Sequence, residues 1–242
     1  MNKDLPAFER FCPSVSVIIP ALNEEKNIGN SLSALLAEDY PAFEIIVVDN
    51  GSSDRTSDIA SKFDGVKVLR EDRKGTMWAC EKGRSVASGE IIVRMDADCV
   101  PEKDWLMNGV RHFKNPRVLA VSGPYDYFDY SPLFRIVSSF VQVYPYWLAS
   151  NTLQMFGKSG VVIGGNSFMR SSTLKEVGGF DTRIEFYGDD TDIAKKFSAL
   201  GRVVYDRHLT LSSSARRFKA HGIFPIIMEY SKAFWGTVLK GK

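Results

Sequence analysis

Two carboxylates separated by one residue, Asp96 and Asp98, are the strongest chemical signal in this sequence. They follow the apolar run 91–95, which predicts a strand buried on both faces. Side chains two positions apart point the same way, so both carboxylates can reach one hard divalent cation, which takes oxygen ligands. A solvated acidic turn is the alternative, but two close carboxylates repel each other unless a cation lies between them. The pair therefore predicts a metal site.

A second acidic cluster, Asp189, Asp190 and Asp192, opens a helix predicted over 189–200. Acids in a first turn complement the helix dipole, and this capping role explains one or two of the three. A carboxylate held beside other acids has its proton affinity raised, which suits a general base that takes a proton from a hydroxyl. The cluster therefore predicts a catalytic base.

Glycines occur where a ligand could approach the backbone, but not in a phosphate-binding loop. Neither G-x-G-x-x-G nor G-x-x-x-x-G-K-[ST] is present, so a bound diphosphate would need a metal to neutralise it. Gly164 and Gly165, which precede Asn166, permit close approach of a ligand, although a strand bend is an equally simple reason for them.

Alternating strands and helices must position these residues. Short β-branched runs predict strands at 15–19, 44–48, 66–69, 91–95 and 119–122. Helix-length segments predict helices at 24–36, 54–63, 76–87, 103–113, 171–177 and 189–200. This order is typical of an α/β fold with a mostly parallel sheet flanked by helices, in which ligands bind beyond the carboxyl ends of the strands.

Polar residues follow the first two strands as well. The first ends in the run 20–25 (Pro-Ala-Leu-Asn-Glu-Glu) and the second in 49–54 (Asp-Asn-Gly-Ser-Ser-Asp). Asn23 and Asp54 could each be a helix N-cap, and 49–51 could be only a turn. Their coincidence with Asp96 and Asp98 at one sheet edge favours a binding site.

Composition and charge limit the class of protein. The 242 residues carry 31 Lys plus Arg and 29 Asp plus Glu, a formal net charge of +2, so no nucleic-acid partner is expected. Cys12, Cys80 and Cys99 are odd in number and far apart, which excludes a disulfide framework and a zinc ribbon. The sequence shows neither a secretory signal at its start nor an uncharged apolar run of about 18 residues, so we expect a cytoplasmic location.

Six motifs, in order and in spacing, resemble the inverting family 2 glycosyltransferases with the GT-A fold. They are 17–25 (VIIPALNEE), 47–54 (VVDNGSSD), 95–98 (MDAD), 164–166 (GGN), 178–181 (GGFD) and 188–193 (GDDTDI). The likeness covers about 14–217. It implies one GT-A domain over 1–242, with a nucleotide-sugar half at 14–122, an acceptor-side lobe at 123–221 and an amphipathic helix at 222–242.

The resemblance also implies a reaction, in which a sugar moves from a nucleotide-diphosphate donor, with uridine the favoured base, to a hydroxyl acceptor. The residues it assigns to the nucleotide are Pro20, Ala21, Asn23, Glu24, Asp49, Lys74 and Asp96. Mn²⁺ or Mg²⁺ would be held by Asp96 and Asp98. The sugar and acceptor pocket would take Gly165 and Asn166, and the diphosphate Arg216 and Arg217, for which a solvated basic pair is the alternative. Asp190 would be the base, with Asp189 the other candidate.

Three departures from the family pattern stand out. Asn50 replaces a second Asp, Asp189 replaces the Glu of a Glu-Asp pair, and the stretch 79–83 (ACEKG) lacks an Ala-Arg-Asn motif. Lys74 and Arg84 are candidates to supply the missing positive charge.

The acceptor could be a saccharide or a lipid-linked molecule. The segment 223–239 mixes aromatic, aliphatic and basic residues, as does a helix lying on a membrane surface, and such contact would put the chain at the inner face of a membrane. An ordinary core-facing final helix is the alternative.

Two other functions remain open. Residues 96–100 fit the D-x-D-x-[TV] pattern of a haloacid-dehalogenase-type phosphatase with Asp96 as nucleophile, although that pattern normally follows the first strand of its domain. A catalytically silent nucleotide-sugar binder is the second, and the acids at 189–192 argue against it.

Overall fold

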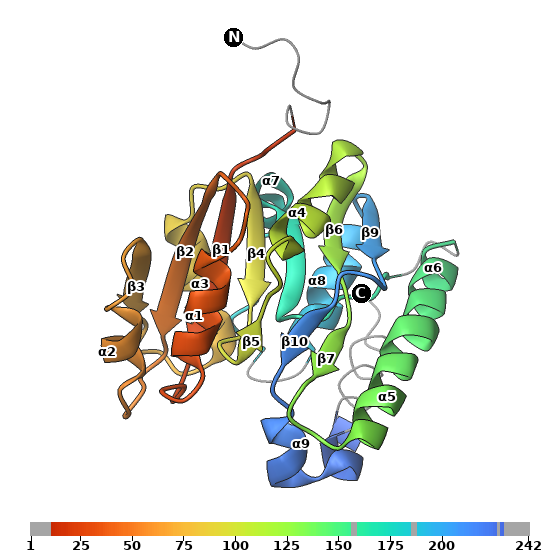
Figure 1. Cartoon of the computed structure of the whole chain (residues 1–242). Helices are drawn as coiled ribbons and strands as arrows, with labels where there is room; N and C mark the ends of the chain where they lie inside the picture. The colour runs from red at the N-terminus through yellow and green to blue at the C-terminus, as the bar shows by residue number, and fades with distance from the viewer. Residues whose placement is uncertain (1–10, 156–158, 185–187, 227, 230–242) are drawn as a thin grey trace.

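A seven-stranded sheet forms the centre of the molecule (Figure 1). The structure is a computed structural model and describes residues 11–155, 159–184, 188–226 and 228–229. In spatial order the strands are β3 (Val66–Arg70), β2 (Phe43–Asp49), β1 (Val15–Ala21), β4 (Ile91–Met95), β8 (Asn166–Arg170), β6 (Val118–Ser122) and β9 (Arg202–Tyr205). Neighbouring strands are parallel except where β8 pairs with β4 and β6. The predicted α/β fold is confirmed, and residues of both halves of the chain share one sheet.

Apolar residues pack on both faces of this sheet. Along β1, Val17 and Ile19 belong to one core and Ile18 to the other, because side chains alternate across a strand. The first core includes residues of α1 (Ile28–Leu36), α2 (Thr56–Ala60) and α4 (Trp105–Val110), which continues into the 3₁₀ turn η1 (Arg111–Lys114). The second includes residues of α3 (Thr76–Val86), α7 (Ser171–Glu176) and α8 (Asp189–Ser198). The strand ends between these layers are thereby held in fixed positions.

A smaller sheet lies beyond the ends of the main strands. It contains β5 (Cys99–Val100), β10 (Leu211–Ser213) and β7 (Tyr125–Tyr127), in that order. Ser213 pairs with Cys99, so the segment that leads into α9 (Arg216–His221) is held directly beside Asp98. The small sheet therefore brings the late basic residues to the acidic pair.

One long helical rod was not predicted. It consists of α5 (Pro132–Val141), the π-helical turn η2 (Gln142–Tyr146) and α6 (Trp147–Met155), and it stands at the edge of the molecule (Figure 1). Its start carries a recognisable signal, because Ser131 caps the N–H of Phe134 at 3.3 Å and Pro132 occupies the first turn. The region is rich in aromatic residues, which are also common in strands, so this helix start was not recognised from the sequence.

Helix boundaries differ from the predicted ones at two site loops. The helices predicted to start at 24 and 54 begin at Ile28 and Thr56. The Glu24 carbonyl accepts hydrogen bonds from the N–H groups of Asn27 and Ile28, so a turn precedes α1. Of the predicted C-terminal helix over 222–242, residues 227 and 230–242 lie outside the described residues. Among the helices of the described residues, none is both long and apolar enough to cross a membrane.

Candidate active site

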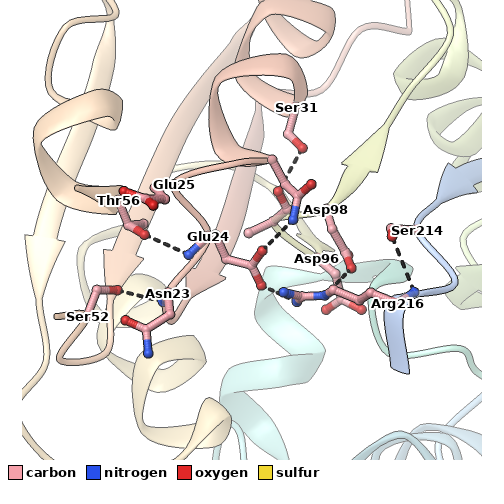
Figure 2. A network of polar contacts seen from close by, with 12 residues as sticks. Asn23, Glu24, Glu25, Ser31, Ser52, Thr56, Asp96, Asp98, Ser214 and Arg216 are labelled. Atoms are coloured by element: carbon pink, nitrogen blue, oxygen red, sulfur yellow. Dashed lines mark hydrogen bonds and ion pairs between the residues drawn. The ribbon is translucent and has the colours of Figure 1, made fainter. Parts of the chain in front are cut away.

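Glu24, Asp98 and Arg216 form a charged cluster where β1, β4 and β10 meet (Figure 2). The Arg216 guanidinium donates a hydrogen bond from Nη2 to Glu24 Oε1, and its Nε lies 2.8 Å from Asp98 Oδ2. Glu24 and Asp98 are both buried. Burial and the neighbouring Asp96 raise the pKa of Asp98 to about 6, and Arg216 opposes that rise. Arg216 thus places a cation against Asp98, one of the two carboxylates for which the sequence predicts one, and its second partner is Glu24 rather than Asp96.

Asp96 is held from two sides. Its Oδ2 accepts a hydrogen bond of 3.0 Å from the Tyr125 hydroxyl, and its Oδ1 lies 3.9 Å from Arg94 Nη2. A Cβ on Gly165 would lie 2.2 Å from the carboxyl carbon of Asp96 and 2.3 Å from the Tyr125 hydroxyl. Only glycine permits this approach, which explains one residue of the glycine pair. The other strand-end acid, Asp49, is buried and accepts a 3.3 Å hydrogen bond from the N–H of Ser52.

Hydrogen bonds join the loops that follow β1 and β2. Asn23 donates its N–H to Ser52 Oγ and accepts from the N–H of Ser53, each at 2.9 Å (Figure 2 shows the first). Asp54 accepts from the N–H groups of Thr56 at 2.9 Å and Glu25 at 3.0 Å. Asn23 is therefore not a helix cap, and the N-cap residue of α2 is Arg55 rather than Asp54, although Asp54 accepts from the first N–H of that helix. Both residues fix the loop that carries Glu24.

Asn50 has a structural reason to depart from the family's usual Asp. Its Nδ2 donates to the carbonyls of Glu71 and Arg73 at 3.0 and 2.7 Å, and its Oδ1 accepts from the N–H of Gly75 at 2.9 Å. An ionised Asp has no donor for the two carbonyls. The amide therefore fixes the loop before α3 against the end of β2.

Arg94 separates the roles of the two acids at the start of α8. Its Nη1 donates to Asp189 Oδ2, and the Arg94 side chain is only 11% exposed. Among the described residues no arginine or lysine is paired with Asp190, whose Oδ1 accepts from the N–H of Thr191 at 2.8 Å. Burial and the Asp189 charge raise the pKa of Asp190 to about 7, against the opposing charge of Arg94. Of the two candidates, Asp190 has the proton affinity that a base needs at neutral pH.

Two adjoining cavities meet at Asp96. The smaller, of about 300 Å³, is lined among others by Pro20, Ala21, Glu24, Asp98 and Arg216. The larger, of about 590 Å³, is lined by Asp189, Asp190, Gly165 and many apolar side chains. The residues that line both are Thr76, Asp96, Tyr125, Tyr127, Arg217 and Phe218. The two acidic clusters therefore open onto one continuous site.

Four predicted site residues do not line either cavity, namely Asn23, Asp49, Lys74 and Asn166. Asn166 is fully buried, accepts from Trp105 Nε1 at 3.1 Å, and donates to the Leu209 and Pro124 carbonyls at 2.8 and 3.2 Å. Its amide thereby joins α4 to the segments around β7 and β10. Arg84, a candidate for the missing positive charge, pairs instead with Glu81.

Arg94 is the residue that the sequence analysis missed. It lies in the otherwise apolar strand β4, two positions before Asp96 and four before Asp98. A single charge inside a buried strand, in period-two register with the acidic pair, is the signal that could have found it.

Comparison with known proteins identifies the family. The sequence profile of glycosyl transferase family 2 matches residues 16–178. The glycosyltransferase AglE of Haloferax volcanii is 32% identical over 184 residues, covering 73% of this chain and 59% of that protein. The poly-β-1,6-N-acetyl-D-glucosamine synthase of Staphylococcus epidermidis is 30% identical over 180 residues, covering 69% of this chain and 42% of that protein. This chain spans about half the length of these curated relatives.

Solved structures share the fold. The mannosyltransferase PcManGT from Pyrobaculum calidifontis, in complex with GDP-Man and Mn²⁺, superposes with a TM-score of 0.73 at 22% identity, covering 99% of this chain and 68% of that one. Glucosyl-3-phosphoglycerate synthase from Mycobacterium tuberculosis, in complex with Mn²⁺, UDP-glucose and phosphoglyceric acid, gives 0.62 at 18% identity, covering 99% and 87%. The fold is of the GT-A type, and the chain belongs to glycosyl transferase family 2.

Proposed function

We propose that this chain transfers a sugar from a nucleotide-diphosphate donor to a hydroxyl acceptor with inversion at the anomeric carbon. The observation that carries the proposal is the junction at Asp96 between the two cavities. On one side lie carboxylates that hold a cation, and on the other lies Asp190, with its raised pKa. The smaller cavity takes the nucleotide diphosphate and the larger one the acceptor, so the transferred sugar lies at their boundary.

The residues present fit a divalent cation. Asp96 and Asp98 supply carboxylate oxygens, and the Arg216 guanidinium lies against Asp98 as a stand-in cation. Within the described part of the chain, no group of three or more Asp, Glu, His or Cys residues could hold a metal. Mg²⁺ is commonly held by one or two carboxylates together with substrate phosphates, and this donor set matches that arrangement. When bound, the cation offsets the charge that develops on the leaving diphosphate.

The chain's own groups carry the proton and the leaving group. Asp190 accepts the acceptor's hydroxyl proton while that oxygen forms a bond to the anomeric carbon on the face opposite the diphosphate. The bond between that carbon and the diphosphate oxygen breaks, and its electron pair leaves with the nucleoside diphosphate. Arg216 and Arg217 line the smaller cavity and donate hydrogen bonds to the departing oxygens. Asp189 stays paired with Arg94 and keeps the first turn of α8 in place.

The finer assignments extend the proposal. Uridine is our favoured base, although relatives of this fold have been crystallised with GDP-Man as well as with UDP-glucose. Pro20, Ala21 and Glu24 line the nucleotide cavity, while Asn23 and Asp49 position its loops. Residues of both the proposed donor half, 14–122, and the proposed acceptor half, 123–221, line each cavity, so the two halves would meet in one site. A lipid-linked acceptor suits the apolar lining of the larger cavity better than a saccharide.

A thermal-shift panel tests the proposal. UDP, GDP, UDP-glucose and GDP-mannose are each added with and without Mn²⁺. A ligand at a hundred times its dissociation constant adds about 2.7 kcal/mol of stability, so one nucleotide should raise the unfolding temperature by several degrees only when Mn²⁺ is present. An Asp98→Asn variant is the control and should lose the Mn²⁺-dependent part of the shift. If none of the four nucleotides gave an Mn²⁺-dependent rise in the unfolding temperature, the proposal would be refuted.

A further inference from the structure

The helical rod 132–155 exposes an unusual amount of apolar surface. The structure describes all ten residues of α5, and none of them is buried. The exposed fractions are 72% for Leu133, 68% for Ile136, 60% for Phe140, 60% for Leu148 and 85% for Met155. Soluble proteins rarely expose large contiguous apolar patches, and those that do so use them to bind something. The outward side of this rod therefore indicates an interaction surface.

The rod has two apolar sides. Leu133, Phe134, Val137 and Val141 line the larger cavity, whose wall also contains Asp190. Ile136, Phe140, Tyr144 and Leu148 recur every four residues, do not line that cavity and are at least half exposed. Apolar surface thus continues from the proposed base to the outside of the molecule.

The charged residues around the rod indicate what kind of partner it binds. The segments that form and border the rod, 125–155 and 207–221, contain five basic residues and two acidic ones, namely Arg135, Arg207, Arg216, Arg217 and Lys219 against Asp126 and Asp129. Arg207 lies over the Trp147 ring at 5.5 Å, and Phe218, between Arg217 and Lys219, packs on Phe134 at 5.0 Å. Basic residues therefore lie beside α5 and at the start of α6. Of the five, Arg135 and Lys219 pair with Asp126 and Asp129, and Arg216 pairs with Glu24 and Asp98.

We propose that the outward side of the rod docks on the surface of a bilayer that contains anionic lipids. Apolar and aromatic side chains enter the boundary between headgroups and acyl chains, and the basic residues contact the headgroups. Tyr144 and Trp147 present an amphipathic ring of the kind that favours this boundary. If the proposed function holds, an acceptor lipid can pass from the bilayer along the rod into the larger cavity and reach Asp190.

A second copy of the chain fits this surface less well. A two-fold contact places the same patch of each copy against the other, so the basic residues beside the rod would face like charges. Anionic headgroups neutralise these charges instead. This surface differs from the segment 223–239 that the sequence analysis considered for membrane contact. Phe224, which belongs to that segment, is 73% exposed.

Vesicle sedimentation tests the docking surface. The full chain is mixed with vesicles of phosphatidylcholine alone or of equal parts phosphatidylcholine and phosphatidylglycerol. We expect sedimentation with the anionic vesicles that weakens as salt is raised. The triple variant Ile136→Gln/Phe140→Gln/Leu148→Gln should lower the partition coefficient by about tenfold or more, because each substitution removes apolar area from the contact. The control Leu36→Gln/Leu200→Gln, exposed apolar residues outside the rod, should leave it unchanged.

Three results decide the matter. Absence of sedimentation with anionic vesicles, or equal sedimentation of the triple variant and the wild type, overturns the proposal. Light scattering that shows a wild-type dimer converted to a monomer by the triple variant, with vesicle binding unaffected, assigns the surface to self-association instead. Thermal unfolding with the nucleotide and Mn²⁺ is measured on the same variants. An intact nucleotide shift without vesicle binding refutes only the docking surface, whereas a missing shift in the wild type refutes the proposed function.

Discussion

Two arginine-carboxylate clusters flank Asp96, and they differ in how firmly the arginine is held. Arg216 lies between Glu24 and Asp98 at the start of the six-residue helix α9, and 40% of its side chain is exposed. Arg94 lies between Asp189 and Asp96 within the central strand β4, and its side chain is 11% exposed. Arg216 therefore lies on a partly exposed segment, whereas Arg94 is fixed in the core.

This difference assigns different tasks to chemically similar groups. A partly exposed arginine can turn away when a metal and a diphosphate enter, so its cluster is suited to binding and release. A buried arginine pairs with Asp189 and holds it in place, whereas burial and the Asp189 charge raise the pKa of Asp190. The following predictions challenge this distinction.

Asp190→Asn should have the largest effect. An amide cannot accept the hydroxyl proton, so the transfer rate should fall by about a thousandfold, within the usual range for loss of a general base. Nucleotide binding, measured by thermal shift with Mn²⁺, should be retained. The matched control is Asp192→Asn in the same helix turn, whose side chain pairs with Lys196, and it should change the rate less than about threefold. Normal turnover by Asp190→Asn would show that the base lies elsewhere.

Arg94→Met should destabilise the fold by about 3 kcal/mol, because it leaves Asp189 as an unpaired, mostly buried charge. Urea unfolding measures this loss. Arg84→Met is the control: it removes a more exposed pair with Glu81 and should cost about 1 kcal/mol or less. Adding Asp189→Asn to Arg94→Met should restore much of the stability. An equal loss of unfolding free energy in Arg94→Met and Arg84→Met would show that the buried Arg94 does not stabilise the fold more than an exposed arginine does.

The pH profile of transfer should show the raised pKa of Asp190. Below about pH 7 the base is protonated, so kcat/KM should fall about tenfold per pH unit, and above it the profile should level off. Asp189, Arg94 and Tyr146 are the charged or titratable groups that interact with this carboxyl.

Stability should change in the opposite direction over the same range. Because the pKa of Asp190 is raised on folding, the folded chain keeps a proton that the unfolded chain loses, and the free energy of unfolding falls as pH rises from about 4 to 7. Asp190→Asn removes this component. If Asp190→Asn kept the wild-type pH dependence of both the transfer rate and the unfolding free energy, Asp190 would not be the group with the raised pKa.

Arg216→Gln should have the smallest and most specific effect. Without the guanidinium, Asp98 loses its internal cation, so Mn²⁺ alone should bind a few-fold tighter than to the wild type, about 1 kcal/mol. Calorimetric titration with Mn²⁺ and no nucleotide measures this change. Lys219→Gln, which breaks a pair with Asp129 in the same helix, is the control and should leave Mn²⁺ affinity unaltered. Weaker Mn²⁺ binding by Arg216→Gln would show that the arginine does not occupy the cation's place.

The local pattern predicts the first half of the fold better than the second. Strands such as β1 and β4 are largely apolar runs with polar residues directly after them, so periodicity and position suffice to find them. β8 and β9 were missed, since Asn166–Arg170 and Arg202–Tyr205 are short and carry polar residues at their ends. The rod over 132–155 was missed because its aromatic residues favour strands as readily as helices.

Some residues of the candidate site could be predicted from local sequence patterns and others could not. Asp96, Asp98, Asp189 and Asp190 were found from their spacing, and Gly165 from its type. Asn166 and Asn23 were assigned to ligands, but their described hydrogen bonds are to the protein itself. Those bonds join residues 30 to 61 positions apart in sequence, a separation that no local pattern reveals.

The sequence by itself determined the family, the five strands of the first half of the chain and the two acidic clusters, because strand periodicity, turn residues and closely spaced carboxylates are local properties. Only the tertiary structure decided which cation each cluster has, that among the described residues Arg94 pairs with Asp189 and not with Asp190, and that the apolar rod faces outward. Those outcomes depend on burial and on contacts between distant segments: Arg94 and Asp189 are 95 residues apart, and Glu24 and Arg216 are 192 apart. A charge's surroundings, rather than its neighbours in the chain, set its proton affinity and its partner.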